Sequence, residues 1–115
     1  MGLSRGGKQG KKVRFLMREL IMSIKENSYF AGGVKSLGFS QHEQEVSVGV
    51  MLPGEYTFGT QAPERMTVVK GALIVKRVSE TDWTTYNSGE SFDVEGNSSF
   101  ELQVKDATAY LCEYL

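Results

Sequence analysis

Most of the chain consists of short runs in which apolar and polar side chains alternate. In the segment EVSVGVML, Val46, Val48 and Val50 are separated by Ser47 and Gly49. A period of two is typical of a β-strand with one buried face, because successive side chains on a strand point to opposite sides. Similar runs of strand length continue to the C-terminus, and together they predict an all-β protein.

Turn residues separate these runs at short intervals. Pro53-Gly54, Lys70-Gly71 and Asn87–Gly89 are combinations that favour tight turns. Runs of this length with glycine-containing turns are typical of a β-sandwich or a small closed barrel. Only the region near Arg14–Glu26 has a pattern compatible with a helix.

The composition indicates one soluble domain with an uneven distribution of charge. The chain has 115 residues and a net charge of −1, and a length of this order is typical of a single domain. Six of the 13 basic residues but only one of the 14 acidic residues lie within positions 1–21, so the remainder carries a net charge of −6. An acidic domain is poorly suited to the phosphate backbone of nucleic acid, and no apolar run approaches the roughly 20 residues that cross a bilayer. We therefore expect neither nucleic acid nor a membrane as a partner.

The basic segment 1–21 is interpreted as an extension of the folded domain. Met17 and Met22 both offer alternative starts, and the sequence MREL before Met22 is compatible with a translated ribosome-binding site. We therefore expect residues 1–21 to be disordered or not native, and residues 22–115 to form the domain.

The single cysteine, Cys112, excludes an internal disulfide framework. It lies in AYLCEYL among large apolar residues, which favours a buried packing thiol over a nucleophile. The lack of disulfides is typical of a reducing compartment, so we expect a cytoplasmic protein.

One short motif indicates a cupin-like arrangement without its metal. ERMTVVKG, which begins at Glu64, has the spacing of the second half of the first cupin motif, where the glutamate shares a metal with histidines. Counting from Glu64 and from Gly89 places the histidine positions on Phe58, Thr60 and Phe100. Aromatic carbon does not bind a transition metal, and one carboxylate is too few ligands. We therefore expect no metal site.

Longer segments of the sequence extend the likeness to cupins. GEYTFGTQAPERMTVVKGAL, DWTTYNSGESFDVEGNSSFELQV and TAYLCEYL occur in this order, and together they closely resemble the small bacterial pyrimidine/purine nucleoside phosphorylases of the cupin superfamily. The resemblance covers nearly all of residues 28–115. It implies a single cupin-like jelly-roll β-barrel, usually dimeric, that cleaves nucleosides into free base and ribose 1-phosphate. Inorganic phosphate is then the co-substrate, and no cofactor is implied.

Two positions depart from the pattern that we associate with this family. VEGNSS holds Glu95 where the family commonly has VPG, and the C-terminal CEYL holds Glu113 where some members have an arginine. The second departure removes a C-terminal arginine from the candidates for phosphate binding.

Four aromatic residues are candidates for base binding: Tyr56, Phe58, Phe100 and Tyr110. Stacking of a nucleobase on an aromatic ring contributes roughly 1–3 kcal/mol and discriminates little between bases. The alternative is that the phenylalanines only fill the core. Gln103 is added as a contact because its amide both donates and accepts hydrogen bonds, although strand parity places it opposite Phe100.

Glu64 is the candidate catalytic residue. Its alternation partners Met66 and Val68 are apolar, so Glu64 should point with them into the interior. The resemblance implies a sugar transition state with oxocarbenium character, which a nearby carboxylate can stabilise.

Phosphate also needs a binding site. The chain has no P-loop or glycine-rich turn that would bind it. We select Lys35 and Ser36, with Thr60 as a helper, as phosphate-binding residues.

Two functions remain open on the sequence alone. The family-like words favour the phosphorylase, whereas the lack of an acid/base histidine favours a non-catalytic cupin-like module for small-ligand binding or assembly. In either case the apolar runs VSVGVML and TAYLCEYL have more hydrophobic faces than one interior can use, and sheet edges must be paired or covered. We therefore expect a homodimer.

Overall fold

The computed structural model describes residues 23–115, which form antiparallel β-strands and one short 3-10 turn. In chain order the elements are β2 (Lys25–Tyr29), η2 (Phe30–Gly32), β3 (Val34–Gln41), β4 (Gln44–Met51), β5 (Gly54–Gly59), β6 (Glu64–Lys70), β7 (Ala72–Arg77), β8 (Thr84–Asn87), β9 (Ser91–Val94), β10 (Ser99–Val104) and β11 (Thr108–Tyr114). The predicted extension 1–21 lies outside the described residues. Within the described part of the chain, no helix is long and apolar enough to span a bilayer.

The helical pattern predicted near Arg14–Glu26 is wrong at the end that the structure describes. Lys25 and Glu26 belong to β2, where they pair with Gly38 and Leu37 of β3. Pairing with a neighbouring strand therefore overrides the local propensity of this short segment.

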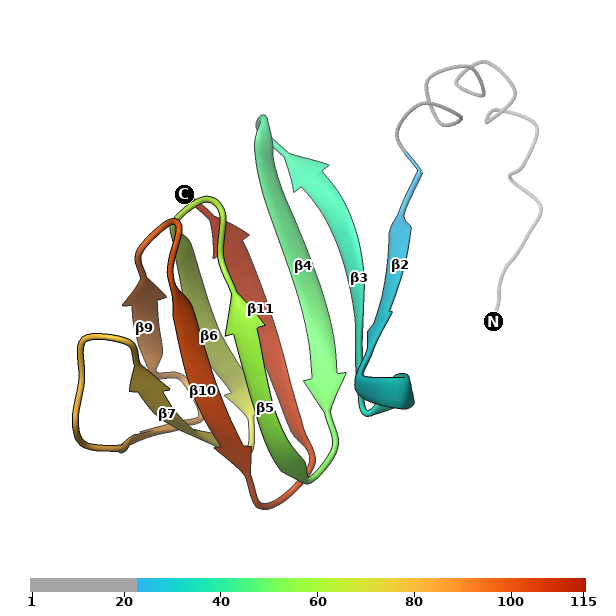
Figure 1. The fold of residues 1–115 in the computed structure, drawn as a ribbon. Coiled ribbons are helices and arrows are strands. Elements are labelled where there is room, and N and C mark those ends of the chain that lie inside the picture. The colour runs from blue at the N-terminus through green and yellow to red at the C-terminus, as the bar shows by residue number, and fades with distance from the viewer. Residues whose placement is uncertain (1–22) are drawn as a thin grey trace, which may run out of the picture.

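The strands form two sheets that face each other (Figure 1). One sheet has four strands in the order β5-β10-β7-β8, and the other has six strands in the order β2-β3-β4-β11-β6-β9. The C-terminal strand β11 lies between β4 and β6, so the last residues of the chain occupy the centre of the larger sheet.

The core lies between these sheets and follows the alternation of the strands. On β6 the side chains of Met66 and Val68 are buried, and on β10 those of Phe100, Leu102 and Val104 are buried. Residues from both sheets form one hydrophobic cluster. The prediction of an all-β domain with inward-pointing Met66 and Val68 is therefore confirmed.

The prediction of a closed barrel is not matched, because no ladder joins the two sheets within residues 23–115. Aromatic side chains fill both seams. At one seam Tyr29 and Phe30 pack edge-on against Phe58, with ring centroids 5.8 and 5.3 Å apart. At the other seam Tyr86 packs on Phe92, with centroids 4.7 Å apart. A ladder needs backbones about 4.8 Å apart, and rings inserted between the strands prevent that approach.

A buried threonine connects the two sheets at one end. Thr108 of β11 accepts a hydrogen bond from the Ala72 N–H of β7 at 3.2 Å, and its hydroxyl lies 2.8 Å from the Asp106 carbonyl oxygen. A Cβ at Gly71 would lie only 2.5 Å from the Thr108 Oγ1, and Gly71 has a φ of +103°. The turn predicted at Lys70-Gly71 therefore requires glycine both for its conformation and for this close contact.

Candidate active site

A cavity of about 150 Å³ lies between the inner faces of the two sheets. The six-stranded sheet forms a polar wall, and the four-stranded sheet forms an aromatic wall. The polar wall carries Ser36, Ser47, Glu64, Tyr110, Cys112 and Tyr114, and the aromatic wall carries Phe58 and Phe100. Five of the predicted site residues therefore come together here: Glu64, Phe58, Phe100, Tyr110 and Ser36.

Strand register builds the polar wall. Gly49 of β4 pairs with Ser36 of β3 on one side and with Tyr110 of β11 on the other. A Cβ at Gly49 would lie 2.6 Å from the Tyr110 hydroxyl oxygen, so glycine leaves the space that this ring occupies above β4. Burial raises the pKa of Tyr110 to about 12, and its hydroxyl therefore stays protonated and able to donate near neutral pH.

Glu64 begins β6 and points inward beside β11. The Cys112 thiol donates a hydrogen bond to its Oε1, with sulfur and oxygen 3.5 Å apart. Burial raises the pKa of Glu64, and the bond from Cys112 lowers it by a smaller amount. The pKa of Cys112 is itself raised to about 12, first by burial and then by the charge of Glu64. Cys112 is thus a buried thiol, as predicted, and it also acts as a donor to Glu64.

The aromatic wall consists of two roughly parallel rings. Phe58 and Phe100 have centroids 5.9 Å apart and an interplanar angle of 27°. Phe92 packs edge-on against Phe100 from the interior, at 6.0 Å. Phe100 is almost fully buried, whereas Phe58 is only partly buried. The wall combines core packing with an aromatic surface that faces Glu64.

Tyr56 and Thr60 lie near the cavity but do not line it. The Tyr56 hydroxyl donates to the Leu52 carbonyl oxygen at 2.6 Å. The Thr60 hydroxyl donates to the Glu95 carbonyl oxygen at 2.6 Å and accepts from the Ser98 N–H at 3.0 Å. Both hydroxyls therefore have protein partners, which ties them to the structure of the surrounding loops.

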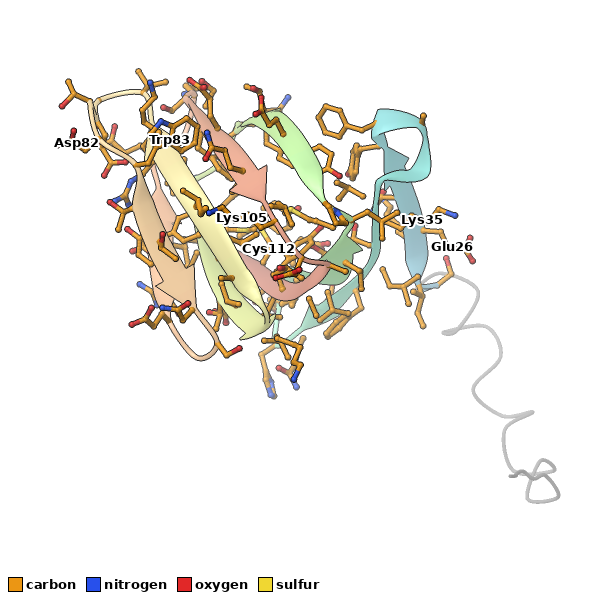
Figure 2. All side chains as sticks on the ribbon, turned by 90° about the horizontal axis from the view of Figure 1, so that it is seen from below. Glu26, Lys35, Asp82, Trp83, Lys105 and Cys112 are labelled. Atoms are coloured by element: carbon orange, nitrogen blue, oxygen red, sulfur yellow. The ribbon has the colours of Figure 1, made fainter. Side chains whose placement is uncertain are left out.

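Two other predicted residues lie outside the cavity. Lys35 is exposed on the outer face of β3, because its neighbour Ser36 points inward and adjacent side chains alternate. Figure 2 shows Lys35 beside Glu26, at the side of the molecule that carries β2, while Cys112 lies near the middle. Gln103 lies with Glu55 on the outer face of the smaller sheet. The predicted pair Lys35–Ser36 is thus divided between two faces.

A larger hollow of about 580 Å³ adjoins the cavity. The two share five lining residues: Tyr29, Ser47, Gly59, Glu64 and Tyr114. Lys25 and Asn27 of β2 and Gln61 of the loop after β5 line the hollow but not the cavity. None of these three residues was predicted to belong to the site. For Lys25 and Asn27 the available signal was the alternation of Lys25, Asn27 and Tyr29 along one face of a strand, which the helical pattern predicted near Lys25 obscured.

Within residues 23–115 no three His, Cys, Asp or Glu side chains lie close enough to hold a metal ion together. Two positions at which a cupin would have histidines, Phe58 and Phe100, line the cavity, and the third, Thr60, is buried beside it. Glu64 therefore faces aromatic carbon in place of nitrogen ligands.

Comparison with known proteins identifies close relatives. Residues 24–114 match the family described as pyrimidine/purine nucleoside phosphorylase. A protein of that name from Vibrio parahaemolyticus is 93% identical over 94 residues, which cover 82% of this chain and 100% of the relative. Another from Vibrio campbellii is 85% identical with the same coverage of both chains.

Solved structures share the fold. The crystal structure of a protein of unknown function from Vibrio parahaemolyticus is 92% identical, has a TM-score of 0.79, and covers 81% of this chain and 99% of its own. EutQ from Clostridium difficile is 15% identical with a TM-score of 0.61, and the match covers 70% of this chain and 66% of EutQ. Likeness at so low an identity concerns the fold alone, and it supports a cupin-like all-β architecture.

The raised pKa of Glu64 predicts how stability depends on pH. In the folded state the pKa of the Glu64 carboxyl lies above its ordinary value of 4.5, so the folded protein binds this proton more tightly than the unfolded chain does. Glu64 therefore contributes stability at low pH, and this stability is lost as the pH rises through the folded-state pKa. Urea unfolding from about pH 4 to about pH 7 should therefore show wild type losing stability relative to Glu64→Gln. Glu101→Gln, on the exposed outer face of β10, is the matched control. A wild-type protein that gains stability over Glu64→Gln with rising pH would contradict the burial of this carboxylate.

Proposed function

The chain belongs to the pyrimidine/purine nucleoside phosphorylase family, and on this premise we propose that it cleaves purine and pyrimidine nucleosides with inorganic phosphate. A phosphate oxygen forms the new bond to the sugar carbon C1′ while the bond from C1′ to the base nitrogen breaks. The electron pair of that bond goes to the base, and the proton of hydrogen phosphate ends on the base. The products are the free base and ribose 1-phosphate.

The position of Glu64 carries this proposal. Glu64 lines both the inner cavity and the outer hollow, so it lies where the two spaces join. The inner cavity, at about 150 Å³, is small for a whole ligand, since sites for small molecules usually measure about 300–1,000 Å³. A base that enters between Glu64 and Phe100 would leave its sugar at the junction and phosphate outside. C1′, which joins base and sugar, then lies beside the carboxylate.

The chemistry of each wall suits one part of the nucleoside. Phe58 and Phe100 offer ring faces on which purines and pyrimidines both stack. Ser47 and Tyr114 line both the cavity and the hollow, and their hydroxyls can bond the sugar at the junction. Among residues 23–115, those that line the cavity include no side-chain amide, a group well suited to distinguishing base edges, and this supports broad specificity.

In this mechanism Glu64 stabilises the positive charge that develops on the sugar as the base departs. A carboxylate in a partly buried site interacts more strongly with such a charge than it would in water. The thiol of Cys112 holds one carboxylate oxygen at 3.5 Å and thereby orients it. No step requires a metal, because the donor set around Glu64 consists of hydroxyls, a thiol and aromatic rings.

We propose that the reaction takes place in the cytoplasm. Cys112 is a free, buried thiol, which is compatible with a reducing compartment.

We also propose that two copies associate through the outer face of the six-stranded sheet. Leu37, Val48, Val50 and Val69 form an apolar patch there, each between 40% and 59% exposed. We call this the outer patch. Exposed contiguous apolar surface marks an interaction site, and a two-fold contact requires a self-complementary surface. Glu26 and Lys35, of opposite charge, both border the outer patch, so a second copy presents a matching edge.

Replacing the Glu64 carboxylate tests the proposed phosphorylase activity. Glu64→Gln keeps the shape of the side chain but removes its charge, so turnover should fall by about 10²-fold or more with little change in fold. The measurement is chromatographic release of base from uridine and inosine, with and without phosphate. Glu101→Gln, on the exposed face of β10, should retain wild-type turnover.

Other outcomes of this assay are equally informative. Near-normal turnover in Glu64→Gln would show that the carboxylate is not the stabilising charge. Wild-type release of base without phosphate would make the protein a hydrolase. Absence of release from any nucleoside would favour a non-catalytic ligand-binding or assembly module.

A charge in the outer patch tests the dimer. Light scattering at micromolar concentration should give the mass of two chains for wild type, and Val48→Glu should shift it to one chain because the new carboxylates would be buried against each other. Val78→Glu is the control, since Val78 is 68% exposed and lies outside the outer patch. A monomeric wild type would overturn the interface.

A further inference from the structure

Within the described part of the chain, a single basic side chain lines the outer hollow next to Glu64. Among the described residues that line the cavity or the hollow, Lys25 is the only lysine or arginine. Two acidic residues, Glu45 and Glu64, line the hollow with it. A phosphate anion that enters this space would therefore meet two carboxylates and one ammonium group.

The register of β2 directs Lys25 into the hollow. Lys25 pairs with Gly38 of β3, where a Cβ would come within 3.7 Å of the Lys25 Cβ, so no side chain opposite displaces the stem of the lysine. Two residues further along the same face, Asn27 donates to the Ser36 hydroxyl at 3.3 Å. After two more residues Tyr29 packs against Phe58. One face of β2 thus carries, in order, the Lys25 ammonium group, the Asn27 amide and the Tyr29 ring, which contacts the aromatic wall.

The other lysines and arginines within residues 23–115 line neither the cavity nor the hollow. Arg65 pairs with Asp93 at 2.8 Å, and Arg77 pairs with Glu80 at 2.7 Å. The Lys76 ammonium lies over the Trp83 ring, 5.4 Å from its centroid. Lys35 lies on the outer face of the sheet.

We propose that Lys25, assisted by the amides of Asn27 and Gln61, binds the phosphate nucleophile at the mouth of the cavity. The proposal rests on the phosphorylase function and adds a residue to its binding site. The Lys25 ammonium group supplies a positive charge. A hydrogen bond from a charged donor to a phosphate oxygen is stronger than one from a neutral donor. Asn27 and Gln61 line the same hollow, and their amide groups supply further N–H donors.

This placement also defines the direction of attack. The base occupies the inner cavity and phosphate the outer hollow, with Glu64 at the boundary. Phosphate therefore approaches C1′ from the side opposite the departing base. Lys25 also offsets the repulsion that Glu45 and Glu64 would exert on the incoming anion.

Kinetics of Lys25→Gln test the proposal. The variant should raise the KM for phosphate about 10- to 100-fold, which corresponds to loss of one hydrogen bond to a charged group, while the KM for inosine changes little. Lys35→Gln is the control, because Lys35 pairs with Ser28 of β2 but its side chain lies on the outer face of the sheet. This variant should leave both constants unchanged. Lys25→Arg should restore part of the affinity for phosphate. An equal rise in both KM values, or an equal effect of Lys35→Gln, would overturn the assignment.

Titration calorimetry with inorganic phosphate separates this proposal from the function on which it rests. Wild type and Lys35→Gln should bind phosphate alike, and Lys25→Gln should bind it about 10- to 100-fold more weakly. If no nucleoside releases its base but this binding pattern holds, the phosphorylase function fails and the phosphate site stands. If Lys25→Gln binds phosphate as wild type does, the site fails whatever the activity. Circular dichroism confirms that each variant is folded.

Discussion

The alternation of side chains along β3, β4, β6 and β11 is the constraint on which the rest of the structure depends. These four strands lie side by side in the larger sheet, and each sends every second side chain to the interior. The same register that places Glu64 and Cys112 inside places the outer patch outside. A slip of one residue would turn the inward side chains of the affected strand, such as Glu64 of β6 or Cys112 of β11, to the outer face of the sheet. The cavity and the outer patch therefore lie on opposite faces of the larger sheet, and the same alternation of side chains produces both.

Burial of a lone carboxylate is costly unless it finds donors. Here Cys112 donates to Glu64, and the aromatic wall opposite leaves room for a ligand with hydroxyl groups of its own. Rings at both seams of the sandwich hold the sheets together without a ladder, and two of them, Tyr29 and Phe58, also line the cavity. The same side chains thus pack the two sheets together and shape the cavity. In a cupin-like fold this arrangement replaces metal coordination with stacking and a single negative charge.

Strand alternation explains both what the sequence could predict and what it missed. It correctly indicated an all-β fold, an inward Glu64 beside Met66 and Val68, and a Gln103 on the face opposite Phe100. The same rule places Lys35 and Ser36 on opposite faces of β3, so these adjacent residues cannot bind one phosphate ion together. Closure into a barrel depends on how rings pack between strands distant in sequence, which no local pattern records. The sequence did not predict Lys25 as a site residue, because its segment becomes a strand through pairing with β3 and not through the propensity of the residues next to it in sequence.

The central claim is that aromatic side chains at the metal-ligand positions leave Glu64 to act without a metal. The most direct measurement is nucleoside turnover by protein treated with a chelator, with metal content determined by mass spectrometry on the same sample. We predict unchanged turnover at a metal content far below one ion per chain. Turnover that disappears with the metal and returns when one ion per chain is restored would contradict the claim.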